Sequence, residues 1–78
     1  MFYVYLIRSL TSGIVYVGIS KNVEQRLSEH NKGKSTFTKG YLPFELIYQE
    51  GPYETKEARI REKQLKRTDV KNRILSNL

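Results

Sequence analysis

Five side chains of this 78-residue sequence have types and spacings that could act together in one site. Four of them belong to a stretch that runs from residue 2 to residue 30, and the fifth comes much later in the chain. Their function depends on whether they face one another after folding, because the groups of one site usually converge from several elements. In chain order they are Tyr5, Tyr16, Arg26, His30, which is the only histidine, and Glu62.

Glu62 is the most informative of these residues outside the first stretch. On a helix, the i, i+4 and i+7 spacing places Ala58, Glu62 and Leu65 on one side. A carboxylate at the border of an apolar face can bind a hard cation such as Mg²⁺, which takes oxygen ligands and keeps most of its waters. The alternative is an ordinary salt bridge with a neighbouring arginine or lysine of the same helix, which are Arg59, Arg61 and Lys66.

Each of the other four residues also has a structural explanation. Tyr5 and Tyr16 could be ordinary aromatic residues of a half-buried sheet, since tyrosine fits that surface and needs only a partner for its hydroxyl. Arg26 could lie on a helix surface, and His30 could lie near a helix C-terminus, where a cation is favoured. Arg26 and His30 are four residues apart and therefore share a neighbouring face of the helix.

Two apolar runs predict a β-hairpin. The run at residues 2–7 is apolar throughout, which favours a strand that is covered on both faces, and residues 14–19 form the second run. With a four-residue loop at residues 9–12, Tyr5 lies opposite Tyr16; a two-residue loop would shift the pairing by two positions. Period two places Tyr3, Tyr5 and Ile7 on one face and Phe2, Val4 and Leu6 on the other.

A capped helix follows the hairpin. Asn22 suits the N-cap, and Gln25 three residues later can complete a capping box. Asn31 and Gly33 are typical of a helix end. We therefore expect a helix that carries Arg26 and His30.

The second half of the chain predicts a loop, a strand and two helices. We expect a loop at residues 32–42 and a strand at 44–49 that ends at Gly51-Pro52. A helix at about 55–66, capped by Thr55, follows the strand. The last helix is capped by Thr68 or Asp69, and its apolar face carries Val70, Ile74 and Leu78. The order β-β-α-β-α-α predicts an α+β fold, an α/β sandwich in which helices flank a small three-stranded antiparallel sheet. We expect one domain over residues 1–78.

The composition limits the classes of protein. The chain has no cysteine, which excludes disulfides and thiolate metal sites. We find neither a secretory leader nor a run of the ~20 apolar residues that cross a bilayer, so we expect a soluble, cytoplasmic protein without a membrane partner.

The net charge of +6 is unevenly distributed. Residues 21–39 hold five basic and two acidic residues, residues 56–73 hold eight and three, and residues 40–55 hold three acids and no base. Two basic segments indicate a surface that attracts a polyanion such as nucleic acid. The alternative is that these lysines and arginines only solvate helix faces.

Taken together, the motifs resemble one known family. Tyr3-Val4-Tyr5, Tyr16-Val17-Gly18, Arg26 ten residues past Tyr16, His30, and Glu62 within the run ARIREKQLK are similar to the GIY-YIG nuclease superfamily, in particular to its small stand-alone bacterial members, in which the first motif is commonly YVY. The similarity covers nearly the whole chain. One tripeptide alone would be a weak signal, whereas the set is specific.

The resemblance implies an endonuclease that hydrolyses DNA phosphodiester bonds with one divalent metal ion, Mg²⁺ or Mn²⁺. By this similarity, Tyr5 or Tyr16 would activate or orient the attacking water. Arg26 would stabilise charge on the phosphate, for which the guanidinium fork is suited. Glu62 would hold the metal, and His30 would serve as an acid, a base or a hydrogen-bond donor to phosphate.

The resemblance also suggests a substrate and an alternative. DNA would contact the basic segments through Lys21, Lys32, Lys34, Lys39, Lys63 and Lys66, and branched or nicked DNA in repair is the candidate substrate. Some family members have a lysine directly after the second motif, where this chain has Ile19, and an asparagine after the glutamate, for which only Asn72 is a candidate. The alternative function is a nucleic-acid-binding module that keeps the fold without efficient cleavage.

Overall fold

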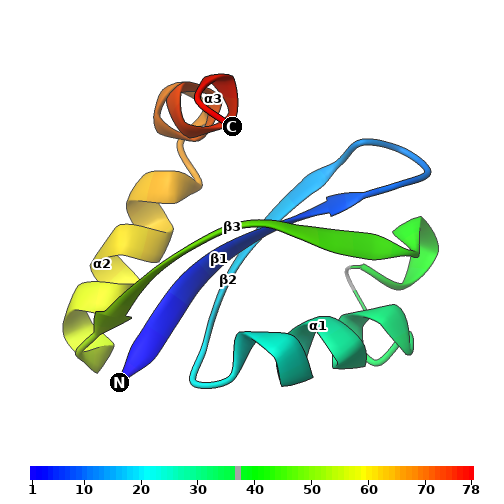
Figure 1. Cartoon of the computed structure of the whole chain (residues 1–78), viewed down its shortest axis with the longest axis horizontal. Helices are drawn as coiled ribbons and strands as arrows, with labels where there is room; N and C mark the ends of the chain where they lie inside the picture. Colours follow the sequence, from blue (N-terminus) through cyan, green and yellow to red (C-terminus); the bar gives the residue numbers. More distant parts are fainter. Residues whose placement is uncertain (37) are drawn as a thin grey trace.

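Three strands form one antiparallel sheet in the order β2-β1-β3, with helices on both faces (Figure 1). The computed structural model of the chain describes residues 1–36 and 38–78. Its elements are β1 (Phe2–Ser9), β2 (Val15–Ser20), α1 (Val23–Asn31), the short 3₁₀ helix η1 (Lys39–Tyr41), β3 (Phe44–Tyr53), α2 (Thr55–Leu65) and α3 (Thr68–Ser76). The predicted α+β class and the order β-β-α-β-α-α are confirmed.

The central strand β1 is buried on both faces, as its continuous apolar run predicts. Tyr5 and Ile7 pack on the side of α1, together with Tyr3. Val4 and Leu6 pack on the other side, against α2. Alternation of side chains along a strand therefore assigns each face of the sheet to its own helix.

The predicted pairing of Tyr5 with Tyr16 is wrong by two positions. Tyr5 lies opposite Gly18, and Tyr16 lies opposite Ile7. Because the shift is an even number of residues, the side chains of Tyr5 and Tyr16 still project from the same face of the sheet.

The position of the turn causes this shift. The hydroxyl of Ser9 accepts hydrogen bonds from the backbone amides of Thr11 (3.2 Å) and Ser12 (3.0 Å). Ser9 therefore stays in the strand, where its own amide donates to the carbonyl of Ile14 (2.8 Å), and the turn begins one residue later than predicted. Gly13 closes it with a φ of 78°, a conformation that glycine adopts without strain.

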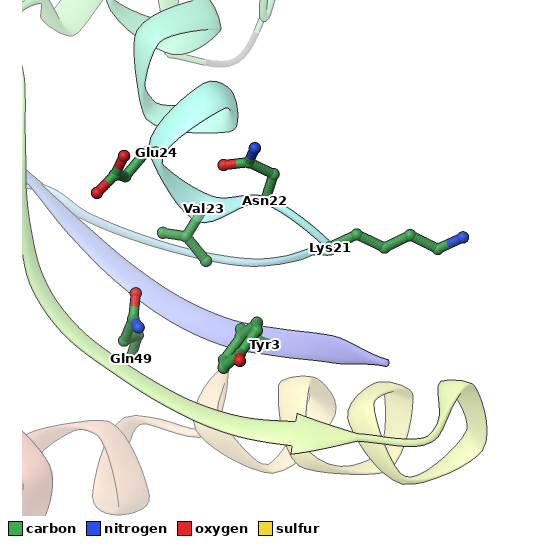
Figure 2. A pocket seen from close by; sticks show the side chains of 6 residues that line it. All are labelled: Tyr3, Lys21, Asn22, Val23, Glu24 and Gln49. Carbon is green, nitrogen blue, oxygen red and sulfur yellow. The ribbon is translucent and has the colours of Figure 1, made fainter.

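Helix α1 begins as predicted. The side chain of Asn22 accepts a hydrogen bond from the amide of Gln25 (3.1 Å). The amide of Asn22 donates to the hydroxyl of Ser20 (3.0 Å), which replaces the reciprocal half of the predicted capping box. Val23 points from the first turn toward the sheet (Figure 2). These contacts fix where α1 starts and which side of it faces β1.

The end of α1 is tied to the third strand. The helix ends at Asn31, and Gly33 has a φ of 78°. The Asn31 side chain accepts a hydrogen bond from the amide of Phe44 (2.7 Å) and donates to its carbonyl (3.0 Å). In the loop predicted at residues 32–42, η1 forms one short turn, and position 37 lies outside the described residues.

Strand β3 is longer than predicted, because it continues through Gly51 and Pro52 to Tyr53. Phe2 pairs with Tyr53 and Val4 pairs with Glu50, so β3 contains one residue more than β1 over this interval and forms a bulge. Gly51 has a φ of 132° there, and a Cβ at this position would lie 2.9 Å from the carbonyl oxygen of Phe2. Because of this bulge, β3 continues through Gly51 and Pro52, which would otherwise end a strand.

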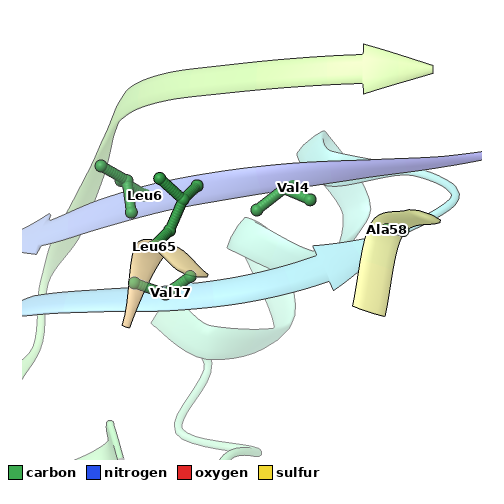
Figure 3. Close-up of a cluster of buried hydrophobic side chains, with 5 residues drawn as sticks. All are labelled: Val4, Leu6, Val17, Ala58 and Leu65. Atoms are coloured by element: carbon green, nitrogen blue, oxygen red, sulfur yellow. The ribbon is translucent and has the colours of Figure 1, made fainter. Parts of the chain in front are cut away.

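Helices α2 and α3 cover the other face of the sheet. Ala58 and Leu65 of α2 pack against a cluster of strand residues, which are Val4, Leu6 and Val17 (Figure 3). Val70 and Ile74 of α3 pack against this cluster as predicted. Leu78 is 62% exposed, and Leu75 packs in its place, because α3 ends at Ser76.

The predicted N-caps of these two helices are wrong by one or two residues. Glu54 and Arg67 occupy the N-cap positions, and neither side chain makes a capping hydrogen bond. Tertiary packing of their apolar faces therefore determines these helices more than local capping does. Within residues 1–36 and 38–78, no helix has the length and apolar character needed to span a membrane.

Candidate active site

Tyr5 is placed by the glycine opposite it. A Cβ at Gly18 would lie 2.5 Å from the Tyr5 hydroxyl oxygen and 2.6 Å from the ring carbon that bears it. The ring of Tyr5 therefore lies across β2 at the one position of that strand without a side chain. Because β2 is an edge strand, this crossing directs the Tyr5 hydroxyl toward the open edge of the sheet.

A buried chain of hydrogen bonds joins Tyr5 to the loop after α1. The Tyr5 hydroxyl lies 3.0 Å from Nε2 of His30, and Nδ1 of His30 lies 2.9 Å from the hydroxyl of Thr38. Tyr5 is 1% exposed, and the other two residues are fully buried. In this structure His30 is therefore closed off from solvent, and its hydrogen bond to Tyr5 links it to the rest of the candidate site.

Several groups act on the Tyr5 hydroxyl. Burial raises the pKa of Tyr5 to about 12, and the nearby Tyr16 adds to this effect. The charge and hydrogen bonding of Arg26 oppose the rise in the pKa, and the charge of Glu62 adds to it. The Tyr5 hydroxyl is therefore protonated at neutral pH and lies within electrostatic reach of three other predicted site residues.

His30 is electrically neutral in this setting. Burial lowers the pKa of its imidazole, the positive charge of Arg26 lowers it further, and Glu29 acts in the opposite direction. Tyr16 packs its ring edge-to-face against His30, with a centroid distance of 5.0 Å and an interplanar angle of 64°. Tyr16 and Tyr5 thus flank the same imidazole.

A cavity of about 380 Å³ opens beside Tyr16 at the free edge of β2. It is lined by Val15, Tyr16 and Val17 from the strand and by Lys66, which follows α2. The free edge of a strand exposes backbone amides, and together with the ammonium group of Lys66 it can bind an extended anionic chain.

Arg26 lies on α1 and acts on the Tyr5 hydroxyl through its charge and hydrogen bonding. Its side chain is 37% exposed and forms an ion pair with Glu29 at 3.1 Å. The hydrogen bond to Glu29 raises the pKa of Arg26 above its ordinary value, so the guanidinium stays charged. A partly exposed guanidinium that also influences Tyr5 can bind phosphate oxygens.

Glu62 lies on α2, on the opposite face of the sheet from Arg26 (Figure 1). On one flank of α2, Nε of Arg61 binds Oε2 of Glu50 on β3 at 2.6 Å. On the other flank, Glu62 lies 3.7 Å from Lys66, which lines the cavity at β2. Glu62 therefore lies on the flank of α2 that faces β2, and its charge acts on Tyr5 beside Gly18.

Glu62 would be the main protein ligand of a metal ion. In residues 1–36 and 38–78, no group of three or more His, Cys, Asp or Glu side chains is placed to hold a metal. One carboxylate, with the remaining positions left to water and phosphate oxygens, fits Mg²⁺ and does not fit a structural zinc site. The alternative of a salt bridge also applies, since Glu62 lies near Lys66.

The predicted nucleic-acid contacts lie on several exposed surfaces. Lys32, Lys34 and Lys39 follow α1, and Lys63 and Lys66 lie on or just after α2. Lys21 lies over the ring of Phe2 (5.4 Å) and is one of the residues that line a cavity of about 260 Å³ at the start of α1 (Figure 2). These lysines therefore do not form one compact cluster.

Neither of the two positions at which the chain departs from the resemblance shares the face of the sheet on which Tyr5 packs. Ile19 packs with the apolar cluster on the α2 side of the sheet, and Asn72 is exposed on α3. Sequence reasoning missed Thr38, because nothing in the composition of its polar loop marks one hydroxyl as buried. It also missed the contact of Gly18 with Tyr5, which the correct strand register would have revealed.

Comparison with known proteins identifies the family of the chain. The family model described as the GIY-YIG catalytic domain matches residues 1–74. The chain belongs to the GIY-YIG family. This family is one of nucleases, and its domain implies binding of nucleic acid.

Relatives of this GIY-YIG chain include UPF0213 proteins. It is 41% identical to one from Staphylococcus aureus strain Mu50 over 66 residues, which cover 82% of this chain and 78% of that protein. It is 38% identical to one from Nitratidesulfovibrio vulgaris over 48 residues, 60% of this chain and only 43% of that protein. The solution NMR structure of a UPF0213 protein from Bacillus halodurans matches with a TM-score of 0.59 and 29% identity, covering 97% of this chain and 84% of that one.

Proposed function

We propose that this chain is a divalent-metal-dependent endonuclease that hydrolyses DNA phosphodiester bonds. One observation carries the proposal: Arg26 and Glu62, which come from helices on opposite faces of the sheet, both act through their charges on the Tyr5 hydroxyl beside Gly18. In hydrolysis of a phosphodiester, a guanidinium can stabilise charge on the phosphate, a carboxylate can hold a metal ion and a phenol can hydrogen-bond the attacking water.

The side chains have distinct roles in this proposal. Arg26 binds the phosphate and stabilises the charge that develops on its oxygens. The Tyr5 hydroxyl orients the attacking water by hydrogen bonding. His30 holds the Tyr5 hydroxyl in place from within the core, and Tyr16 packs against the same imidazole.

Glu62 is the proposed ligand for Mg²⁺ or Mn²⁺. When bound, such an ion stabilises negative charge on the phosphate and provides an acidic water. Lys66 then loses its partner and becomes free to contact the nucleic-acid backbone at the β2 edge.

The charge distribution supports DNA as the substrate, with branched or nicked structures as candidates. Four exposed basic residues of α2 and of the position directly after it lie on the same side of the helix as Glu62, because they are spaced by three or four positions. These residues are Lys56, Arg59, Lys63 and Lys66. A strand that follows this face would pass Glu62 and the edge of β2.

A second candidate function is a binding module that retains the fold without efficient cleavage. The raised pKa of Tyr5, about 12, favours this alternative, because a phenol that holds its proton is a weak base. Both functions require binding of nucleic acid, so only turnover separates them.

A combined binding and cleavage assay separates these candidates. Labelled linear, nicked and branched DNA is incubated with the protein in Mg²⁺, in Mn²⁺ and in EDTA. The endonuclease cleaves in either metal and binds without cleaving in EDTA, with affinity that falls as salt rises. Salt-sensitive binding with no cleavage in either metal would establish the module and refute the endonuclease.

A further inference from the structure

Thr38 is a fully buried polar residue in the loop after α1. It is 0% exposed and occupies the position before η1, yet its side chain makes no capping hydrogen bond to that helix. Within residues 1–36 and 38–78, the partner of its hydroxyl is Nδ1 of His30 at 2.9 Å. Buried hydroxyl groups in proteins are normally hydrogen-bonded, so the contact with His30 is the one that satisfies the Thr38 hydroxyl.

This contact decides which nitrogen of His30 carries the proton. A neutral imidazole donates from one nitrogen and accepts at the other. The Thr38 hydroxyl is fully buried, and Nδ1 is the acceptor that it faces among the described residues, which favours Thr38 as the donor of this hydrogen bond. Nδ1 then has no proton, and Nε2, which lies 3.0 Å from the Tyr5 hydroxyl, carries it.

The direction of these donors sets the orientation of Tyr5. With Nε2–H donating to the Tyr5 oxygen, the proton of Tyr5 must point elsewhere. The Tyr5 hydroxyl lies beside Gly18 at the open edge of β2, so in this tautomer its proton is directed away from His30 and toward that edge, where the negative charge of Glu62 favours the protonated phenol. In the opposite tautomer, Tyr5 would donate its proton back into the core.

We propose that Thr38 is a positioning residue that fixes the Nε2–H tautomer of His30, so that Tyr5 receives a hydrogen bond from His30 and presents its own proton to the substrate. The expected effect on cleavage depends on the endonuclease proposal. The assignment of the His30 tautomer does not depend on it. At metal-ligating histidines, outer partners that fix the imidazole tautomer are worth about 10-fold or more in activity, and we expect an effect of similar size for Thr38.

Other groups around His30 do not replace Thr38. Tyr5 and Tyr16 face the imidazole from the sheet, and Phe44 packs beside it. Arg26 and Glu29 act on it from its own helix through their charges. Among the contacts of the described residues, Thr38 is the one whose hydroxyl faces Nδ1.

Nitrogen-15 NMR of the single histidine tests the tautomer without any assay of activity. Spectra of the imidazole are recorded above pH 6.5 for the wild type, Thr38→Ser and Thr38→Val. We expect a protonated Nε2 and an unprotonated Nδ1 in the wild type and in Thr38→Ser. In Thr38→Val, we expect the two nitrogen signals to move toward each other as both tautomers become populated.

Single-turnover cleavage of DNA provides the second measurement. Thr38→Val should reduce the cleavage rate by about 10-fold with unchanged DNA affinity, and Thr38→Ser should restore it. A protonated Nδ1 in the wild type, or a wild-type spectrum in a folded Thr38→Val protein, would overturn the proposal. If the wild type does not cleave at all, the endonuclease proposal fails and the spectra alone still decide the role of Thr38.

Discussion

At the scale of single residues, Gly18 determines where the Tyr5 hydroxyl lies. The phenol ring occupies the space in which any side chain at position 18 would begin. Sequence alone identified both residues as parts of motifs. Their contact depends on the register of the hairpin, which Ser9 sets through its hydrogen bonds within the turn.

We predict that Gly18→Ala displaces the Tyr5 ring and breaks its hydrogen bond to His30. The new methyl group would lie 2.5 Å from the hydroxyl oxygen, so the ring must move, which should destabilise the fold by about 1 to 3 kcal/mol and abolish cleavage. Gly40→Ala is the matched control, because a Cβ there meets no atom within 4 Å. Chemical denaturation and cleavage assays would measure both effects, and equal behaviour of the two variants would refute this role of Gly18.

The neutral, buried His30 should make stability depend on pH. Because its pKa lies below the ordinary value of 6.5, the unfolded chain binds the proton more readily than the folded chain. The stabilisation is therefore complete above pH 6.5 and is lost as the pH falls through the folded-state pKa. The chain has one histidine, so no other imidazole titrates in this range.

Melting temperatures measured from pH 8 downward would test this dependence. We expect the wild type to lose stability as the pH falls below 6.5. His30→Gln should be less stable at neutral pH and should lack this part of the pH dependence. A wild-type melting temperature that stays constant or rises below pH 6.5 would contradict the assignment.

At the scale of elements, one carboxylate fixes the flank of α2 that faces away from the candidate site. Glu50 of β3 accepts hydrogen bonds from Tyr48 (2.8 Å), Tyr53 (2.5 Å) and Arg61 (2.6 Å). Burial alone would raise the pKa of Glu50, but these donors together lower it below its ordinary value of 4.5. The network anchors α2 to β3 and so helps to place Glu62 on the opposite flank.

Replacing Glu50 should therefore destabilise the protein and weaken the use of metal. We expect Glu50→Gln to cost about 2 kcal/mol, because three donors lose a charged acceptor, and to raise the metal concentration needed for cleavage. Glu45→Gln removes an ion pair with Arg8 whose partners are 47% and 45% exposed, so it should cost less than about 1 kcal/mol. Equal loss of stability in the two variants would contradict the anchoring role of Glu50.

The same acid network predicts a loss of stability at low pH. A carboxyl whose folded-state pKa is lowered stabilises the protein above its unfolded value and loses that contribution as the pH falls through the folded-state pKa. The wild type should therefore lose stability faster than Glu50→Gln below pH 4.5. Parallel stability curves for the two proteins in that range would exclude this contribution.

At the scale of the whole molecule, the sequence predicted the layers better than the contacts between them. Period two assigned Tyr5 and Val4 to opposite faces of the sheet, and helical spacing placed Glu62 beside Ala58, because both patterns are local. The register of the hairpin, the extension of β3 through Gly51 and the burial of Thr38 depend on long-range contacts. No local pattern specifies such contacts, so the candidate site was predicted as a set of residues and its internal geometry was not.

The candidate site depends on the two-sided arrangement of the fold. Arg26 and His30 belong to α1 on one face of the sheet, and Glu62 belongs to α2 on the other (Figure 1). They can act together because β2 is an edge strand and because Gly18, which has no side chain, lets the Tyr5 ring lie across that strand. The central claim is therefore that Glu62 acts on the same phosphate as Arg26 and Tyr5.

The rate of DNA cleavage by Glu62→Gln in single-turnover conditions with Mg²⁺ tests that claim most directly. The matched control is Glu57→Gln, an exposed acid on the other flank of the same helix. We predict that Glu62→Gln loses about 10²-fold or more in rate while it binds DNA at least as tightly as the wild type, and that Glu57→Gln cleaves at the wild-type rate. Cleavage by Glu62→Gln at the wild-type rate would contradict the account.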